Sequence, residues 1–295
     1  MYSLIQKGRR LNLPTDVILI LFDKCVEPIL LYGCEVWGCE NVDILEKVHT
    51  KFCKFIFGVS KFSHNMPVYG ELGRYPLSVT IKQRMVSYWT KLLKSSKEKL
   101  NKVMYLILYH LYCKDIHYSP WIKCISNIFQ TNGTNYVWLM QDHKIDAKSI
   151  QKCECDQFKQ LWHSRITNNN NVMYQLFKTS HCKEMYTEIL PEHLKKALFQ
   201  FRIGTYKLPA NNLKNNNIPR NERICTICDE GVLGDEIHFL YECTKLDDLR
   251  NKYIPSCNRA SANIHNFTRM LQTTEPDQVN DLAKFILYGL KLYCQ

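Results

Sequence analysis

Four potential metal ligands constrain the fold of this chain more than any other feature of its sequence. Cys225, Cys228, His238 and Cys243 follow the spacing C-x2-C-x9-H-x4-C. Two thiols that are two residues apart can hold one metal ion from a tight turn, and an imidazole and a third thiol complete a tetrahedron. Three sulfur ligands and one nitrogen ligand favour Zn²⁺ and leave no position open for a substrate. The spacing therefore predicts one structural zinc ion.

The residues around these ligands are compatible with such a site. The polar spacer between the second cysteine and the histidine contains Gly231 and Gly234, which allow the chain to turn back on itself. Apolar Phe239 and Leu240 directly follow the histidine and can pack against the metal loop. The alternative is that the four are ordinary residues in a chain with 14 cysteines. The ligand types and the closed geometry favour zinc.

A second metal site is conceivable but disfavoured. Its ligands would come from a C-x-C pair and three more distant residues. These are Cys153, Cys155, His163, His181 and Cys182. The C-x-C spacing is strained for one tetrahedral ion, so we interpret these residues as ordinary buried or surface side chains.

A basic segment precedes the predicted zinc site. Residues 195–223 contain seven Lys or Arg residues against one acidic residue, with asparagines and aromatic residues interleaved. Cations neutralise phosphates, amides hydrogen-bond to phosphates or base edges, and aromatic rings stack on bases. Composition alone leaves two interpretations open, a nucleic-acid contact and a solvated loop.

The stretch 201–250 resembles the zinc-binding C-terminal segment of non-LTR (LINE-type) retrotransposon polyproteins. Those segments share an R-x-G-x-x-x-L-P opening, a basic loop, an R-x-C-x-x-C pair and an H-F-L-x-x-C close. The matching residues are Arg202, Gly204, Leu208, Pro209, Arg223, Cys225, Cys228, His238, Phe239, Leu240 and Cys243. One departure is that family members often carry an acidic residue soon after the Leu-Pro, where this chain has Ala210, Asn211 and Asn212.

The N-terminal third of the chain resembles the same elements. The sequences ILLYGCEVWG and VYGELGRYPL, followed by a predicted helix that ends in YWTKLL, are similar to the thumb-like segment after the reverse transcriptase palm. The two matches cover roughly residues 10–95 and 198–250, in the family's order. The chain is therefore similar to the C-terminal part of a retrotransposon reverse transcriptase.

The resemblance implies that the chain binds RNA or target DNA. Beside the zinc site, the residues expected to face nucleic acid are Arg202, Lys207, Lys214, Arg220 and Arg223. The thumb-like part offers further cations for a nucleic-acid backbone. These are Lys47, Lys51, Lys54, Arg74, Lys82 and Arg84. The alternative function is a zinc-stabilised helical domain that binds other proteins and has no role with nucleic acid.

We do not expect an enzyme. Reverse transcriptases hold two metal ions with aspartates on a hairpin, usually in a [FY]-x-D-D pattern. The sole Asp-Asp pair here is Asp247 and Asp248 in TKLDDLRNKY, which is predicted to be helix surface. The sequence contains no phosphate-cradling glycine loop and no nucleophile elbow, so no small-molecule substrate is expected either.

The overall composition narrows the environment of the protein. The formal net charge of +11 favours an anionic partner without identifying it. The longest apolar runs are too short to span a bilayer, and the N-terminus lacks the apolar core of a signal peptide. We therefore expect no membrane partner and reduced thiols in an intracellular compartment, nuclear or cytoplasmic.

The periodicity of apolar residues predicts a mainly α fold. The first apolar helix follows Pro14, should form a buried spine and should kink at Pro28. Further helices are expected at residues 42–57, 78–93, 103–113 (buried), 122–129, 136–139, 150–165, 246–253, 264–271 and 277–294. We expect four segments: a thumb-like helical region (1–125), a helical connector with the Asn-rich linker 168–171 (126–190), a basic zinc module (191–260), and C-terminal helices docked on that module (261–295).

Overall fold

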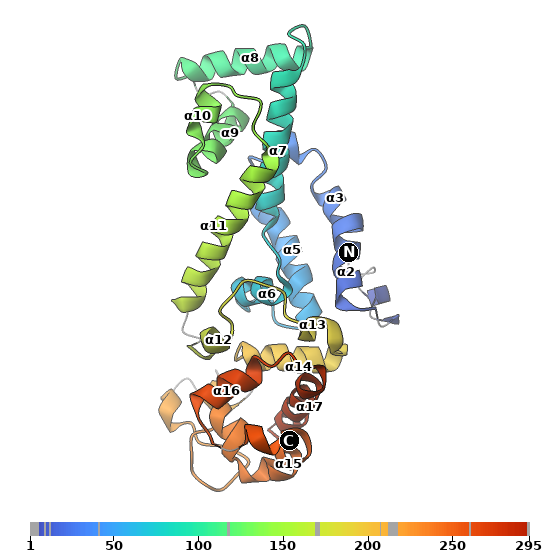
Figure 1. Cartoon of the computed structure of the whole chain (residues 1–295), viewed down its shortest axis with the longest axis vertical. Helices are drawn as coiled ribbons and strands as arrows, with labels where there is room; N and C mark the ends of the chain where they lie inside the picture. The colour runs from blue at the N-terminus through green and yellow to red at the C-terminus, as the bar shows by residue number, and fades with distance from the viewer. Residues whose placement is uncertain are drawn as a thin grey trace. The chain divides into compact units, whose positions relative to one another are not determined.

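The fold is mainly helical, as predicted, in this computed structural model (Figure 1). The structure describes residues 6–8, 10–11, 13–40, 42–116, 119–168, 172–206, 208–211, 218–259 and 261–293. The chain forms two compact units. The first unit contains Met1–Phe52 and Tyr75–Leu161, and the second contains Cys53–Arg74 and Trp162–Gln295. This division differs from the four consecutive segments expected, because each unit combines two separate stretches of the chain.

The first unit consists of helices joined by short turns. It contains α2 (Thr15–Leu21), the π-helical turn η1 (Phe22–Val26), α3 (Glu27–Leu30), α4 (Cys34–Trp37), α7 (Leu77–Lys94), α8 (Leu100–Cys113), α9 (Pro120–Thr131), α10 (Asn135–Leu139), and most of α5 (Val42–Phe57) and α11 (Ala147–Thr167). The helices predicted at residues 42–57 and 78–93 are confirmed to within one residue at each end.

Trp89 lies at the centre of the first unit's core. Its ring is fully buried and packs 4.8 Å from Phe129 and 6.0 Å from Trp138, measured between ring centroids. Its indole N–H donates a hydrogen bond of 2.9 Å to the hydroxyl of Tyr105. A buried indole with a satisfied N–H contributes a large apolar area at no polar cost, so these contacts hold α7, α8, α9 and α10 together.

Pro28 interrupts the first helix, as predicted. A proline has no N–H to donate and its ring crowds the carbonyl of the fourth residue before it. The chain relieves this crowding with the π-helical turn before the proline, where the N–H of Glu27 donates to the carbonyl of Phe22. The expectation of a fully buried helix was wrong. Ile20 is 54% exposed and Ile29 is 77% exposed.

The prediction that residues 103–113 form a buried helix was half correct. The helix is present as α8, but only Lys102 and Tyr105 are buried along it. Several of its apolar side chains are 38–76% exposed: Leu100, Val103, Met104, Leu106 and Ile107. The segment is apolar on most of its circumference, whereas a helix at the edge of a core buries only the side that faces it.

The second unit contains shorter helices and turns. They are α6 (Asn65–Leu72), α12 (Val172–Phe177), α13 (Tyr186–Ile189), α14 (Glu192–Arg202), η2 (Pro209–Asn211), η4 (Arg220–Glu222), η5 (His238–Glu242), η6 (Thr244–Leu246), α15 (Asp247–Tyr253), η7 (Ser256–Asn258), α16 (Ile264–Leu271) and α17 (Pro276–Leu292). Of the predicted Asn-rich linker, residues 169–171 lie outside the described residues. Across the described residues, no helix has both the length and the apolarity that a membrane-spanning segment needs.

Arg202 ties several helices of the second unit together from within. Its guanidinium is buried and lies 3.1 Å from Glu71 on α6 and 3.3 Å from Glu184. It also donates 2.6 Å to the carbonyl of Leu271, at the end of α16. Burial alone would lower the pKa of Arg202, but the two carboxylates raise it above its ordinary value. Arg202 is therefore a charged, fully paired residue of the interior.

The C-terminal helix α17 packs against the residues that follow His238. Phe239 is fully buried, with ring centroids 5.5 Å from Phe201 on α14 and 5.4 Å from Phe285 on α17. At Gly289 of α17, a Cβ atom would come within 2.7 Å of the Phe239 ring. The absence of a side chain there allows α17 to approach the residues that follow His238.

Candidate metal centre

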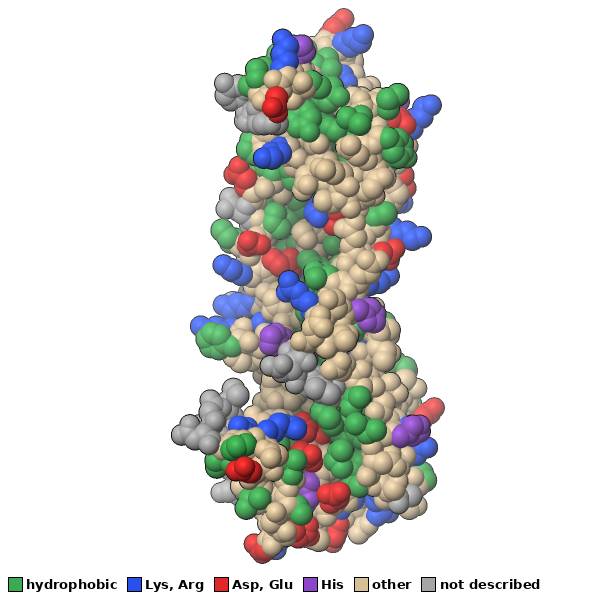
Figure 2. Space-filling view, turned by 90° about the vertical axis from the view of Figure 1, so that its left-hand side faces the viewer, with side chains coloured by type: hydrophobic (Ala, Val, Ile, Leu, Met, Phe, Trp, Pro, Cys, Tyr) green, Lys and Arg blue, Asp and Glu red, His purple; other side chains and the backbone are tan. Residues whose placement is uncertain are grey.

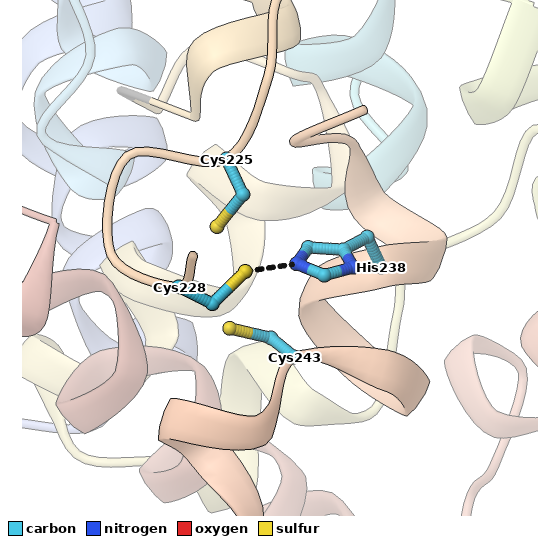
Figure 3. Close-up of side chains that lie close together, drawn as sticks. All are labelled: Cys225, Cys228, His238 and Cys243. Atoms are coloured by element: carbon cyan, nitrogen blue, oxygen red, sulfur yellow. Dashed lines mark hydrogen bonds between the residues drawn. The ribbon is translucent and has the colours of Figure 1, made fainter. Parts of the chain in front are cut away.

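The four predicted ligands meet in one buried cluster (Figure 3). The ligand atoms of Cys225, Cys228, His238 and Cys243 all lie within 4.8 Å of one another, and all four residues are buried. Metal–sulfur bonds of about 2.3 Å in a tetrahedron place the sulfurs about 3.8 Å apart. The cluster therefore needs to contract by only about 1 Å to enclose one ion, and it could hold a metal ion.

A short hairpin positions the first two cysteines. Ile224 and Leu233 form an antiparallel bridge, the sole strand-like pairing among the described residues. The N–H of Cys225 donates 2.8 Å to the carbonyl of Val232. Gly234 follows the bridge, and a Cβ there would come within 2.8 Å of Pro209 and 3.0 Å of Cys225. The glycine thus permits a close approach of three chain segments.

His238 and Cys243 stand at the two ends of a π-helical turn. The N–H of Cys243 donates 2.9 Å to the carbonyl of His238, which brings the two residues onto the same side of the turn. The carboxylate of Asp235 accepts the N–H groups of Ile237 and His238, at 3.1 and 3.0 Å. Capping of this kind satisfies the first donors of a helical turn, and here it fixes the start of the turn that carries the histidine.

Arg250 supports the other end of the same turn. It is buried, and its guanidinium donates 2.8 Å to the carbonyl of Leu240 and 2.9 Å to the carbonyl of Cys243. It also pairs with Asp247. Two carbonyls at the end of the turn are thereby satisfied. We interpret Arg250 as a positioning residue for Cys243.

Hydrogen bonds to the sulfurs favour the thiolate form at one cysteine. Burial would raise the pKa of Cys225, but the hydroxyl of Tyr293 and the backbone N–H groups of Ile227 and Cys228 outweigh burial and lower that pKa to about 7. The Tyr293 oxygen lies 3.0 Å from the Cys225 sulfur.

Burial raises the pKa values of the other two thiols. Burial raises the pKa of Cys228, and burial with the neighbouring Cys225 raises that of Cys243 to about 12. Each of these sulfurs also has a backbone N–H within reach, from Glu230 and Lys245 respectively. Three thiols this close cannot all ionise unless a cation lies among them, and a bound metal supplies that charge.

The histidine is oriented for ligation. Its Nε2 faces the Cys228 sulfur at 3.4 Å. Its Nδ1 is buried without a hydrogen bond and lies 3.5 Å from a carboxylate oxygen of Glu242. Metal-bound imidazoles commonly direct their second nitrogen at a carboxylate, which fixes the ring and its tautomer. The set of side chains fits a metal bound through three sulfurs and one Nε2.

The five basic residues predicted to face nucleic acid have different positions. The prediction that Arg202 faces nucleic acid was wrong. Arg202 is 3% exposed and paired with Glu71, so it cannot contact a phosphate from its buried position. Lys207 and Lys214 lie outside the described residues. Arg220 has 54% of its side chain exposed and pairs with Glu236 at 3.3 Å. Arg223 is half-buried and donates to the carbonyls of Ile218 and Ala210.

Asn211, which follows the Leu-Pro pair, has two side-chain partners. Asn211 donates 2.8 Å to the Glu236 carboxylate and 3.0 Å to the hydroxyl of Tyr206. A carboxylate in place of Asn211 would instead repel Glu236. The amide therefore suits this chain's own packing around the basic segment.

The remaining chemical predictions concern the second metal site and the Asp-Asp pair. Within the part of the chain that the structure describes, one group of potential metal ligands is found, and it excludes Cys153, Cys155, His163, His181 and Cys182. Every described cysteine is a free thiol. Asp247 and Asp248 begin α15 and are exposed, in agreement with the prediction of helix surface.

The sequence alone did not reveal the residues that support the ligands. The contacts of these residues with the cluster follow no sequence motif; the residues are Asp235, Arg250 and Tyr293. Asp235 does stand three residues before His238, which is a spacing typical of a helix cap.

Comparison with known protein families, with curated proteins and with solved structures found no match in any of the three.

Proposed function

We propose that the cluster binds one structural zinc ion and that the chain is the C-terminal part of a non-LTR retrotransposon type of reverse transcriptase, without the catalytic palm. The observation that carries the proposal is the buried, closed set Cys225, Cys228, His238 and Cys243. Four buried protein ligands, three of them sulfurs, favour zinc over harder metals and leave no site for substrate. We therefore propose that this metal ion has a structural and not a catalytic role.

The other motif residues that carry the resemblance build the same module. Leu208 and Pro209 are buried, and Pro209 touches the site of Gly234. Gly204 has a φ of +67°, a backbone angle that residues other than glycine rarely adopt. Phe239 is fully buried. That these motif residues are structural and that several pack beside the four potential ligands supports the proposed relation to elements with the same pattern.

We propose nucleic acid as the partner of this module. Arg220 and Arg223 lie on the short segment that ends at Cys225, so a metal bound there would also order the cations. Pre-ordering lowers the entropy lost on binding. The net charge of +11 favours a polyanion.

The test is the salt dependence of binding by an Arg220→Gln/Arg223→Gln variant. If both side chains contact phosphates of duplex DNA, the slope of log affinity against log salt falls by about two units, roughly 0.9 per contact. A Lys144→Gln/Lys148→Gln variant has the same change in charge at exposed positions of the first unit and should keep the parent's slope. Equal affinity of the Arg220/Arg223 variant and the parent at every salt concentration would refute the role of this segment.

A second candidate function is supported by α8. Its exposed apolar side chains, such as Leu100 at 76% and Met104 at 49%, are typical of a surface that binds another protein. Under this alternative, zinc stabilises the fold and the chain has no role with nucleic acid. A salt-independent, weak interaction with RNA and DNA would favour it over the first candidate.

A further inference from the structure

The second unit contains a groove that is separate from the metal centre. It has a volume of about 600 Å³ and is formed by the end of α5, the loop that leads into α6, and the end of α11. The residues that matter here are Lys54, Lys61, Phe62, His64, Asn65 and Arg165. All of them belong to the second unit.

The lining of this groove is cationic. Lys61 and Arg165 are exposed, and none of the lining residues is Asp or Glu. The buried ammonium of Lys54 donates 2.8 Å to the carbonyl of Lys61 and fixes the loop that carries the other groups. The helix α6 begins at Asn65 without a side-chain cap, so its positive end adds to the field. A concave surface with one sign of charge attracts an anion.

Phe62 adds an exposed aromatic ring to the groove. Its ring is 83% exposed, and the ammonium of Lys61 lies 4.9 Å from the ring centroid. A scattered apolar side chain on a surface is ordinary, but this ring stands within a cationic groove. Figure 2 shows Lys and Arg side chains gathered beside exposed hydrophobic side chains on the face that carries α11.

Cations beside an open aromatic ring match one class of ligand. A small anion needs the cations alone, and an acidic peptide carries carboxylates without a ring at every residue. A duplex presents phosphates but keeps the faces of its bases stacked inside. A single strand presents phosphates and unstacked base faces together. We propose that this groove binds single-stranded nucleic acid, with a base on Phe62 and phosphates beside Lys61 and Arg165.

The proposal shares only the class of partner with the proposed function and uses different residues. Its test is binding of a labelled single-stranded oligouridine and of a duplex, followed by fluorescence anisotropy at several salt concentrations. The variants are Phe62→Ala and Lys61→Gln/Arg165→Gln. All three side chains are exposed, so the folds should be intact, and circular dichroism melting checks this.

The expected results separate stacking from charge. Phe62→Ala should weaken single-strand binding by about 5- to 150-fold, the usual range for one lost stacking contact, and leave duplex binding unchanged. Lys61→Gln/Arg165→Gln should flatten the single-strand salt slope by about 1.4, at about 0.7 per contact. Tyr32→Ala, which removes an exposed ring of the first unit, is the matched control and should bind as the parent does.

Three outcomes would overturn the proposal. They are single-strand binding by Phe62→Ala as tight as the parent's, an equal loss on single strand and duplex, and competition by polyglutamate as effective as that by oligouridine. If Arg220→Gln/Arg223→Gln weakens binding while the groove variants do not, the groove proposal fails and the proposed function stands. If the parent binds neither probe, both fail.

Discussion

Buried Arg202 pairs with the buried Glu71 and with the partly exposed Glu184 in the second unit. Its partners Glu71 and Glu184 come from different parts of the chain, and its third contact is the last carbonyl of α16. A buried ion pair gains little over a well-packed apolar replacement, but removal of one partner leaves an uncompensated charge. Arg202 is therefore needed for the stability of the second unit.

Replacement of Arg202 by Met should destabilise the second unit by about 3–5 kcal/mol, because Glu71 would remain buried without its cation. The double variant Arg202→Met/Glu71→Gln should lose less, since it also removes the buried Glu71 charge, while Glu184 keeps its ion pair with Lys178. Chemical denaturation of the three proteins measures both effects. A single variant as stable as the parent, but with weaker affinity for nucleic acid, would show that Arg202 is instead a surface contact.

Tyr293 should tune the metal centre without being a ligand. Its hydroxyl lies 3.0 Å from the Cys225 sulfur and stabilises the thiolate. Tyr293→Phe keeps the ring against Phe239 and removes only that hydrogen bond. We expect metal affinity to fall by about 10-fold, the lower end of the effect of such supporting contacts. Competition with a chelator of known affinity measures it, and unchanged affinity would count against this role.

The ligands and their supports differ in how far a sequence can reveal them. Cys225, Cys228, His238 and Cys243 lie within 19 residues, so their spacing alone suggested a closed site. Glu71 is 131 residues away from Arg202, and nothing in local spacing joins the two. A basic residue in a basic segment therefore predicted a surface contact, whereas the ion pair with the buried Glu71 decides its place.

The packing of α17 depends on its close approach to the ring of Phe239. A Cβ at Gly289 would come within 2.7 Å of that ring, which is packed on several sides and cannot easily move. Gly289→Ala should therefore destabilise the second unit by about 1–3 kcal/mol, although alanine favours a helix over glycine. Lys291→Ala, at an exposed position of the same helix, is the control for thermal denaturation. A Gly289→Ala variant more stable than the parent would show that helix propensity outweighs packing here.

The periodicity of apolar residues predicted the positions of the helices better than it predicted their burial. The segments α5, α7 and α16 have long apolar stripes and natural stops, and their predicted ends agree with the structure within one residue. Burial of α8 and of the first helix was overestimated. A continuous apolar run reports the absence of polar residues and not the number of neighbours, so it cannot distinguish a central helix from one at the edge.

The four potential metal ligands all belong to the second unit. Metal binding contributes about 10–16 kcal/mol to small modules of this kind and is coupled to their folding. Cys228→Ser should therefore unfold the residues around the cluster and leave the first unit, with its core around Trp89, folded. Hydrogen exchange resolves the two units. Loss of protection around Trp89 to the same extent would contradict this independence.

We propose that the four residues of the cluster bind one zinc ion. Elemental analysis of the protein purified without chelators, by inductively coupled plasma mass spectrometry, measures the zinc content of each chain. We predict one zinc per chain in the parent and none in a Cys225→Ser/Cys228→Ser variant prepared in parallel. A parent without zinc, or a double variant that retains one zinc per chain, would contradict the account.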